Sequence, residues 1–181
     1  MKEWIGYYKD VIPNKLSDDI MSIKGNWKKS NFENYDGTLK DSSHRVTMDE
    51  FNIRDKMIYY KDLLDVTKNV IKLYKNKHPY MKYFAPNKAS DFRVNRYSKG
   101  GFMNEHTDNI HHSHGQQYGF PQGSILYFLN DDYKGGELIM CDMVYKPKKN
   151  SAIIFPSNFM FPHSVNKVEE GTRYSIITWL M

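Results

Sequence analysis

The second half of the chain is divided into short apolar or alternating segments by closely spaced turn residues, and this pattern limits the possible folds most strongly. After Pro86, such segments lie at residues 91–98, 102–108, 123–130, 136–145, 151–155, 159–165 and 171–180. Clusters rich in Asp, Gly, Pro or charged residues separate several of them, at 131–136, 147–150 and 169–171. Short strands at this spacing are typical of two-sheet β-sandwiches. We therefore expect a mainly β (α+β) fold of the jelly-roll type.

The first half of the chain predicts two helices that brace this sheet structure. Ser17, Asp18 and Asp19 precede an apolar group and read as the capped start of a short helix that ends near Gly25. Apolar residues at three- and four-residue steps predict a second helix from residue 55 to about residue 76, before Pro79. Residues 26–50 are polar and irregular, which predicts loops with at most a short strand.

Length and composition favour one domain over residues 1–181, with residues 1–90 as helical support and N-terminal strands and residues 91–181 as the β core. The single cysteine, Cys141, excludes an internal disulfide and a thiolate-rich metal site. The N-terminal residues are charged where a signal peptide would be apolar, and no apolar run approaches the length of a membrane span. We expect a cytoplasmic protein, in the host cytoplasm if a phage encodes it.

The formal net charge of +5 comes entirely from the first half of the chain. Residues 1–90 carry 17 Lys and Arg against 12 Asp and Glu, whereas residues 91–181 carry 9 of each kind. The lysines are scattered rather than clustered, which indicates a solvated surface more than a nucleic-acid face. We expect neither a nucleic-acid nor a membrane partner.

Two histidines and an aspartate are the candidate metal ligands. His106 and Asp108 lie two residues apart on a predicted strand and therefore project from the same face. Alone, such a pair is more often a polar surface pair. His163 lies in an alternating segment with Phe159, Phe161 and Val165, and is expected to point inward; alone, it would read as a core histidine.

Arg173 begins a strand whose alternate residues, Arg173, Ser175, Ile177 and Trp179, are expected to face the interior. A buried guanidinium is costly unless a carboxylate meets it. Glu137 of the protein itself or a dicarboxylate ligand could supply this carboxylate. Two imidazoles and one carboxylate form the facial triad of non-haem Fe(II) oxygenases, and such a centre can hold a 2-oxo acid whose far carboxylate the arginine would bind.

Six motifs, in order along residues 91–181 or nearly so, resemble those of a known family. The sequence resembles 2-oxoglutarate- and Fe(II)-dependent dioxygenases of the prolyl 4-hydroxylase type, including bacterial and phage members and the similar PKHD-type hydroxylases. The motifs are Asn95-Arg96-Tyr97-Ser98-Lys99-Gly100, His106-Thr107-Asp108-Asn109, Tyr127-Phe128-Leu129-Asn130-Asp131, Gly135-Gly136-Glu137-Leu138, Pro162-His163 and Gly171-Thr172-Arg173-Tyr174-Ser175, followed by Trp179.

The resemblance implies a double-stranded β-helix fold with His106, Asp108 and His163 as iron ligands. It implies that Arg173 forms a salt bridge with the distal carboxylate of 2-oxoglutarate, that Tyr127 donates a hydrogen bond to the same carboxylate, and that Tyr97 lies near the cosubstrate. Plain sheet packing is the alternative for both tyrosines. The implied cofactors are Fe(II), 2-oxoglutarate and O2, and ascorbate is a further candidate.

The expected reaction is hydroxylation of an unactivated C–H bond with release of succinate and CO2. A peptidyl proline is the leading substrate. A free amino acid, another side chain or a small molecule remains open, as does a non-catalytic jelly-roll binding module. Base demethylation is disfavoured. Nucleic-acid repair oxygenases of the fold that this sequence resembles have a second arginine six residues after the first, and in this chain that position is Trp179. His111, His112 and His114 are expected to form a solvated loop rather than a second metal site.

Overall fold

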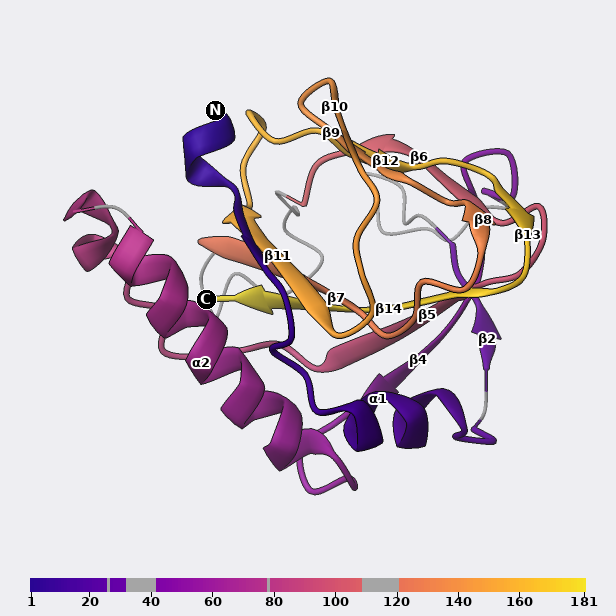
Figure 1. Cartoon of the computed structure of the whole chain (residues 1–181), viewed down its shortest axis with the longest axis horizontal. Helices are drawn as coiled ribbons and strands as arrows, with labels where there is room; N and C mark the ends of the chain where they lie inside the picture. The colour runs from indigo at the N-terminus through magenta and orange to yellow at the C-terminus, as the bar shows by residue number, and fades with distance from the viewer. Residues whose placement is uncertain (26, 32–41, 78, 109–120) are drawn as a thin grey trace.

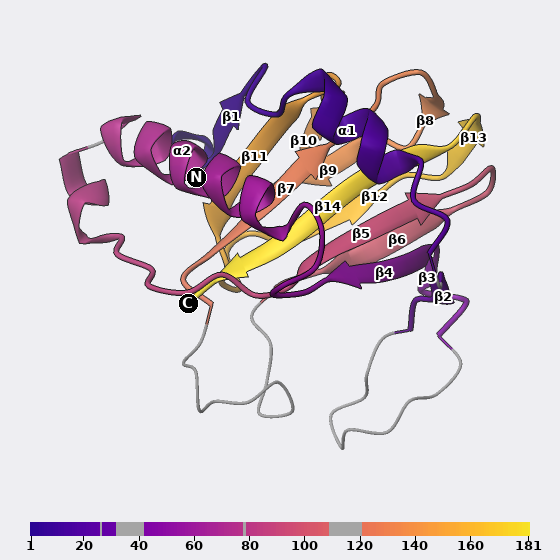
Figure 2. The same cartoon turned by 90° about the horizontal axis from the view of Figure 1, so that it is seen from below.

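The computed structural model describes residues 1–25, 27–31, 42–77, 79–108 and 121–181. Its strands form two main antiparallel sheets that pack face to face, and two helices cover the outer face of the larger one (Figures 1 and 2). The larger sheet has the order β1-β11-β7-β14-β5-β4-β2. These strands are β1 (Gly6–Tyr8), β2 (Lys28–Lys29), β4 (Asp49–Ile53), β5 (Phe92–Tyr97), β7 (Gly123–Phe128), β11 (Ser151–Pro156) and β14 (Arg173–Leu180).

The smaller sheet has the order β10-β9-β12-β6-β3. Its strands are β3 (Val46–Thr47), β6 (Phe102–His106), β9 (Leu138–Met140), β10 (Met143–Tyr145) and β12 (His163–Val165). A separate two-stranded sheet pairs β8 (Lys134–Gly135) with β13 (Val168–Glu170). Short 3-10 helices occupy Lys2–Trp4 and Pro79–Tyr83.

Helices α1 (Asn14–Met21) and α2 (Tyr60–Lys77) form the layer outside the larger sheet. Along α2 the buried residues recur at three- and four-residue steps, so that one stripe of the helix faces the sheet. This stripe consists of Leu63, Val66, Thr67, Val70 and Tyr74. The prediction of bracing helices is confirmed.

Both helices begin elsewhere than the sequence predicted. Helix α1 starts at Asn14 after Pro13, and Ser17 lies inside it, where its buried hydroxyl donates a hydrogen bond to Asn150 Oδ1 at 2.5 Å. Helix α2 starts five residues later than predicted, because Lys56 and Tyr59 each have a φ of 68°. Residues in the left-handed region interrupt a right-handed helix, so the apolar periodicity alone placed the boundary too early.

Several strand predictions also need correction. N-terminal strands were expected within residues 1–90, but the position of the edge strand β1 was not predicted. Residues 26–50 were predicted as loops with a short strand, and they contribute instead to three strands, β2, β3 and β4. The predicted strand 136–145 is broken into β9 and β10 by a tight turn at Cys141 and Asp142, with φ values of 49° and 62°. The predicted strand 159–165 begins only at His163, and Phe159 before it is 76% exposed instead of inward-facing.

The alternation of side chains along β7 divides the core into two parts. Ile125 and Tyr127 belong to the cluster beneath the helices, whereas Leu126 and Phe128 belong to the cluster between the two sheets. The predicted site residues from β6, β12 and β14 lie on the side between the sheets. Across the described ranges, no helix has the length and apolar character needed to cross a membrane.

Candidate metal centre

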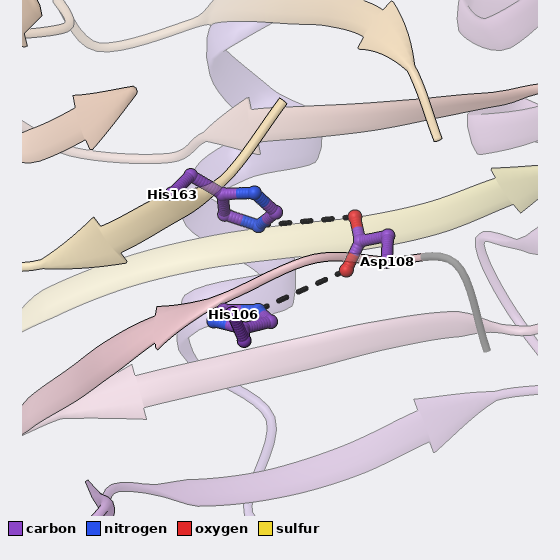
Figure 3. Close-up of side chains that lie close together, drawn as sticks. All are labelled: His106, Asp108 and His163. Atoms are coloured by element: carbon purple, nitrogen blue, oxygen red, sulfur yellow. Dashed lines mark ion pairs between the residues drawn. The ribbon is translucent and has the colours of Figure 1, made fainter. Parts of the chain in front are cut away.

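His106, Asp108 and His163 meet between the two sheets (Figure 3). His106 is the last residue of β6, and His163 is the first residue of the neighbouring strand β12, where it lies directly opposite His106. Asp108 follows two residues after His106. One ligand atom from each of the three side chains lies within 4.8 Å of the other two. The structure therefore brings together the three residues that the sequence singled out as a metal site.

The separations within this triad leave space for an ion rather than forming direct hydrogen bonds. His106 Nε2 lies 3.8 Å from Asp108 Oδ1, and His163 Nε2 lies 3.8 Å from Asp108 Oδ2. Both distances exceed those of an N–H···O hydrogen bond. The two imidazole rings have centroids 4.3 Å apart. Each histidine thus presents Nε2 toward the carboxylate without bonding to it.

The hydrogen bond of the second nitrogen of each imidazole determines which atom of the ring would bind a metal. His106 Nδ1 lies 3.0 Å from the backbone oxygen of Asn104, and His163 Nδ1 lies 3.1 Å from that of Phe161. A carbonyl oxygen only accepts, so each Nδ1 carries the proton and donates it. Nε2 is then left with a lone pair, which is the usual arrangement of metal-binding histidines.

The electrostatics of the triad favour a neutral His106 and an ionised Asp108. Burial, assisted by His163, lowers the pKa of His106 to about 4. Burial alone would raise the pKa of Asp108, but the two imidazoles and a hydrogen bond from Ser124 outweigh it and lower that pKa. Asp108 Oδ2 is buried and has no hydrogen-bond partner. A buried carboxylate oxygen of this kind is costly unless a cation meets it, so the donor set fits Fe(II), the ion of two-histidine, one-carboxylate centres.

The triad lines one end of a cavity between the sheets. Strands β5 and β14 of the larger sheet supply most of the opposite wall. The residues around the cavity are Arg93, Asn95, Tyr97, Met103, His106, Asp108, Leu126, Leu138, His163, Val165, Arg173, Ser175 and Ile177. Eight of these thirteen residues carry polar groups and five are apolar, so the cavity presents many convergent polar groups to a ligand.

Arg173 lies in this cavity with an incomplete set of partners. Its side chain is 1% exposed, and Nη1 donates to Ser175 Oγ at 3.0 Å. The guanidinium carbon lies 5.0 Å from the centroid of the Tyr97 ring. Nε and Nη2 have no hydrogen-bond partner. Among the described residues no carboxylate pairs with it, and Glu137, the internal alternative, lies instead 3.5 Å from Lys146 Nζ.

The two predicted tyrosines lie on opposite faces of the larger sheet. Tyr97 lines the cavity beside Arg173. Tyr127 does not: its hydroxyl lies 2.7 Å from Thr67 Oγ1 of α2, in the cluster beneath the helices. The assignment of Tyr127 to the cosubstrate therefore needs correction, because the side chain points away from Arg173. Successive residues of a strand face opposite sides of the sheet, so a shift of one position along the strand decides whether a side chain faces the cavity or the helices.

Tyr133 takes a position that the sequence analysis missed. Burial raises the pKa of its hydroxyl, while the nearby guanidinium of Arg173 acts in the opposite direction. Gly136, with a φ of 64°, lets the two side chains approach: a Cβ at this position would lie 3.1 Å from Arg173 Cδ and 3.2 Å from Tyr133 Cε2. The Asp-Tyr-Lys-Gly-Gly turn was visible in the sequence, but nothing in its pattern showed that its tyrosine folds back toward β14.

Ser124 is a second residue that sequence reasoning did not find. It is fully buried on β7, hydrogen-bonds to Asp108, and its Oγ lies 2.6 Å from Ser157 Oγ. A small serine in an apolar run gives no signal of such a role. The predicted loop histidines His111, His112 and His114 lie outside the described residues.

The comparisons with known proteins agree with this geometry. The profile of the 2OG-Fe(II) oxygenase superfamily matches residues 92–181. A PKHD-type hydroxylase of Crocosphaera subtropica is 34% identical over 101 residues, which cover 52% of this chain and 44% of that protein. The chain thus spans about half the length of the first curated relatives it matches.

Two solved structures share the fold across nearly the whole chain. A prolyl 4-hydroxylase of Pseudomonas putida superimposes with a TM-score of 0.73 at 14% identity, covering 98% of this chain and 91% of that one. A prolyl hydroxylase of Trichoplax adhaerens, in complex with a hypoxia-inducible-factor peptide, gives 0.72 at 15% identity, covering 99% and 84%. The predicted double-stranded β-helix fold is confirmed.

Proposed function

Since this chain belongs to the 2OG-Fe(II) oxygenase superfamily, we propose that it is an Fe(II)- and 2-oxoglutarate-dependent dioxygenase that hydroxylates a peptidyl proline. One observation carries the proposal more than any other. The three donor atoms of His106, Asp108 and His163 converge in the same cavity as Arg173, a buried arginine without a carboxylate partner among the described residues. A metal triad alone would suit many binding modules, but the arginine adds a site for an acidic ligand.

His106 and His163 would hold Fe(II) through Nε2, and Asp108 through its carboxylate. When bound, Fe(II) and 2-oxoglutarate supply the activation of O2, and the overall reaction converts 2-oxoglutarate, O2 and R–H into succinate, CO2 and R–OH. The Nδ1 hydrogen bonds to Asn104 and Phe161 keep both rings in one orientation and one tautomer. Ser124 holds the carboxylate of Asp108 from the β7 side.

Arg173 would bind the distal carboxylate of 2-oxoglutarate through Nε and Nη2, the two atoms that the protein leaves without partners. A guanidinium binds a carboxylate by two parallel hydrogen bonds when both nitrogens on one edge are free. Ser175 occupies Nη1 and so orients this free edge. Tyr97 would lie against the cosubstrate, because its ring is stacked near the same guanidinium.

Apolar side chains would protect the reacting centre from water. Met103, Leu126, Leu138, Val165 and Ile177 line the same cavity as the triad and Arg173. Excluding water strengthens the electrostatic contacts inside the site and prevents side reactions of the oxidant. The protein's own contribution is thus to hold the metal on one face, orient the cosubstrate and keep the cavity dry.

The choice of a peptidyl proline is supported by the relatives. PKHD-type hydroxylases, human prolyl 3-hydroxylase 2 and several prolyl hydroxylase structures are among the proteins that this chain resembles. Another prolyl hydroxylase structure is a complex with a peptide fragment of the oxygen degradation domain of hypoxia-inducible factor. We propose the same substrate class here, in a domain that spans residues 1–181.

The test is a panel of Pro-containing peptides, free amino acids and small molecules, incubated with Fe(II), 2-oxoglutarate and O2. Mass spectrometry should show the gain of one oxygen on a Pro-containing peptide, with an equal amount of succinate. The His163→Ala variant is the matched control and should produce neither. A free amino acid as the preferred substrate would retain the oxygenase and reject the peptidyl proline. An enzyme that binds both Fe(II) and 2-oxoglutarate but makes no succinate with any panel member would reject the oxygenase activity.

A further inference from the structure

One segment of the chain carries the whole excess of positive charge. Residues 66–90 contain six lysines and no Asp, Glu or Arg. The complete chain has 26 Lys and Arg against 21 Asp and Glu, so the rest of it has 20 against 21 and is nearly neutral. The segment comprises most of α2 and the 3-10 helix Pro79–Tyr83 that follows it (Figures 1 and 2). Lysines that look scattered along the sequence are therefore concentrated on one part of the molecule.

Three of these lysines lie on the outer face of α2, opposite the stripe that packs on the sheet. Lys68, Lys72 and Lys75 follow one another at steps of four and three residues, which makes them neighbours on the helix surface. Lys68 pairs with Asp65 one turn earlier, at 2.9 Å. Among the described residues no acidic group forms an ion pair with Lys72 or Lys75. This end of α2 thus presents uncompensated positive charge.

Two exposed tyrosines follow directly on the 3-10 helix Pro79–Tyr83. Side chains three residues apart eclipse each other in a 3-10 helix, so Tyr80 and Tyr83 project from one side of it. They are 68% and 76% exposed, and Phe159 is the only other exposed aromatic residue in the described part of the chain. Lys82 Nζ lies 4.9 Å from the centroid of the Tyr83 ring. Aromatic rings and ammonium groups therefore share one surface.

The two tyrosines stand on a well-packed support. Met81, between them, is 5% exposed, and the Phe84 ring packs against that of Tyr74 of α2 with centroids 5.6 Å apart. Exposed tyrosines on a fixed support are typical of protein–protein interfaces, where this residue is enriched. Lys72, Lys75, Tyr80, Lys82 and Tyr83 are called the lysine–tyrosine surface below.

The lysine–tyrosine surface lies near the end of the larger sheet that carries the metal centre, but outside its cavity. A Cβ on Gly123, the first residue of β7, would lie 2.9 Å from Phe84 Cζ. The next residue of β7, Ser124, hydrogen-bonds to Asp108. None of the five residues of the lysine–tyrosine surface lines the cavity of the triad. A polypeptide with one residue at the metal centre would therefore have a more distant segment within reach of this surface.

The chemistry of the surface favours an acidic polypeptide as its partner. Unpaired ammonium groups attract carboxylates, and tyrosine rings pack on the apolar side chains and main chain of a peptide. Arginine is the usual residue of nucleic-acid recognition, and residues 66–90 contain none. The apolar stripe of α2 is already buried against the sheet, so a lipid surface would gain little more than two tyrosine rings.

We propose that the lysine–tyrosine surface is a docking surface for an acidic segment of the protein substrate, away from the residue that is hydroxylated. The lysines would attract the carboxylates of this segment, and the two rings would pack on apolar side chains between them. This inference rests on the proposed function and deepens it, because it specifies a protein that carries an acidic segment.

Fluorescence anisotropy of labelled probes tests the proposal, with the protein loaded with Fe(II) and 2-oxoglutarate under nitrogen. The acidic probe is a capped peptide of repeated Glu-Asp-Leu, and the neutral probe has Gln and Asn in place of Glu and Asp. Oligothymidylate and vesicles of phosphatidylcholine and phosphatidylserine are the other two probes. One variant combines Lys72→Gln, Lys75→Gln and Lys82→Gln, and a second combines Tyr80→Ser and Tyr83→Ser.

The matched control combines Lys24→Gln, Lys28→Gln and Lys29→Gln. It removes the same charge from exposed lysines on and before β2, at one edge of the larger sheet. The lysine–tyrosine surface lies toward the other edge, because the Tyr74 hydroxyl of α2 donates to the backbone oxygen of Trp4, just before β1, at 2.7 Å. An effect of net charge alone would appear equally in both lysine variants.

We expect the acidic peptide to bind the wild type, and to bind more weakly as the ionic strength rises. The Lys72/Lys75/Lys82 variant and the Tyr80/Tyr83 variant should each bind it about tenfold more weakly, whereas the control should bind as the wild type does. The visible band of the Fe(II)–2-oxoglutarate complex should be the same in every variant. Joining the acidic segment to a Pro-containing substrate should lower KM about tenfold in the wild type but not in the Lys72/Lys75/Lys82 variant, with kcat unchanged.

Three binding results would overturn the docking surface: equal affinity for the neutral peptide, an equal loss in the control variant, or tighter binding of oligothymidylate or vesicles through the same lysines. The proposed reaction is judged separately. If the acidic peptide binds as expected but no Pro-containing peptide gains oxygen, the docking surface stands and the peptidyl hydroxylation falls. If a Pro-containing peptide is hydroxylated with the same KM with and without the acidic segment, the reaction stands and the docking surface falls.

Discussion

Arg173 and Tyr97 lie directly opposite each other on the paired strands β14 and β5, with the guanidinium carbon 5.0 Å from the centroid of the tyrosine ring. The pair three positions along the same strands, Ile176 and Val94, points to the opposite face and is completely buried beneath the helices. A slip of one residue would move those aliphatic groups into the cavity and Arg173 beneath the helices. The apolar core on one side of the sheet thus fixes the position of the Arg173 guanidinium on the other side.

Replacing Arg173 by Leu should weaken 2-oxoglutarate binding by about two orders of magnitude, because a bidentate, charge-assisted contact is lost. Fe(II) affinity should change little, since Arg173 makes no contact with the triad. Anaerobic titration of the Fe(II) protein with 2-oxoglutarate, followed by the visible charge-transfer band, measures the first quantity, and calorimetry with Fe(II) measures the second. Arg54→Leu, on an exposed side chain, should leave both unchanged. An equal loss of both affinities in Arg173→Leu would contradict the role.

Replacing Asp108 by Ala should abolish Fe(II) binding, because it removes the carboxylate whose unpartnered Oδ2 faces the triad. The metal-free fold should lose about 1 kcal/mol of stability, because the hydrogen bond from Ser124 is lost. Fe(II) should raise the thermal unfolding temperature of the wild type and not that of the variant, because only the folded triad binds the ion.

The neighbouring variant Glu105→Ala serves as the control for Asp108→Ala. Glu105 is exposed on β6, immediately before His106, and its substitution should preserve the Fe(II)-induced shift. A shift of wild-type size in Asp108→Ala would remove Asp108 from the ligand set.

The apolar periodicity in the sequence predicted most strands and made the three triad residues candidate metal ligands, and the family resemblance then implied that they bind one iron. His106, Asp108 and His163 could be found because inward-facing polar residues on apolar strands are costly and therefore conspicuous. Residues such as Lys56 and Tyr59, whose φ values are positive, give no such signal, and the start of α2 was misplaced for that reason. Arg93 and Asn95, which line the cavity, were also missed, because they are ordinary polar residues until the alternation of β5 places them on its inner face.

Tyr127 illustrates how a one-residue alternation limits such predictions. Tyr127→Phe should leave 2-oxoglutarate affinity unchanged and lower the free energy of unfolding by about 1 kcal/mol, because only the hydrogen bond to Thr67 is lost. Tyr133→Phe should instead weaken 2-oxoglutarate binding several-fold, since the Tyr133 hydroxyl lies near the guanidinium of Arg173. The same titration and urea unfolding measure both variants. If Tyr127→Phe weakens 2-oxoglutarate while Tyr133→Phe does not, the original assignment of Tyr127 is restored.

The stability of the metal-free protein should fall as the pH is lowered from about 6.5 to about 4. His106 has a pKa of about 4 in the folded chain, below its ordinary value of 6.5, mainly because of burial. In this window the unfolded chain binds a proton that the folded chain does not, so protonation favours unfolding, by about 1 to 3 kcal/mol across the window. Urea unfolding in the presence of a chelator, at pH 7 and at pH 4.5, measures the difference. His106→Gln should lose most of this pH dependence, whereas His44→Gln, at an exposed position, should retain it. An identical slope in wild type and His106→Gln would show that the imidazole of His106 is not held neutral by the fold.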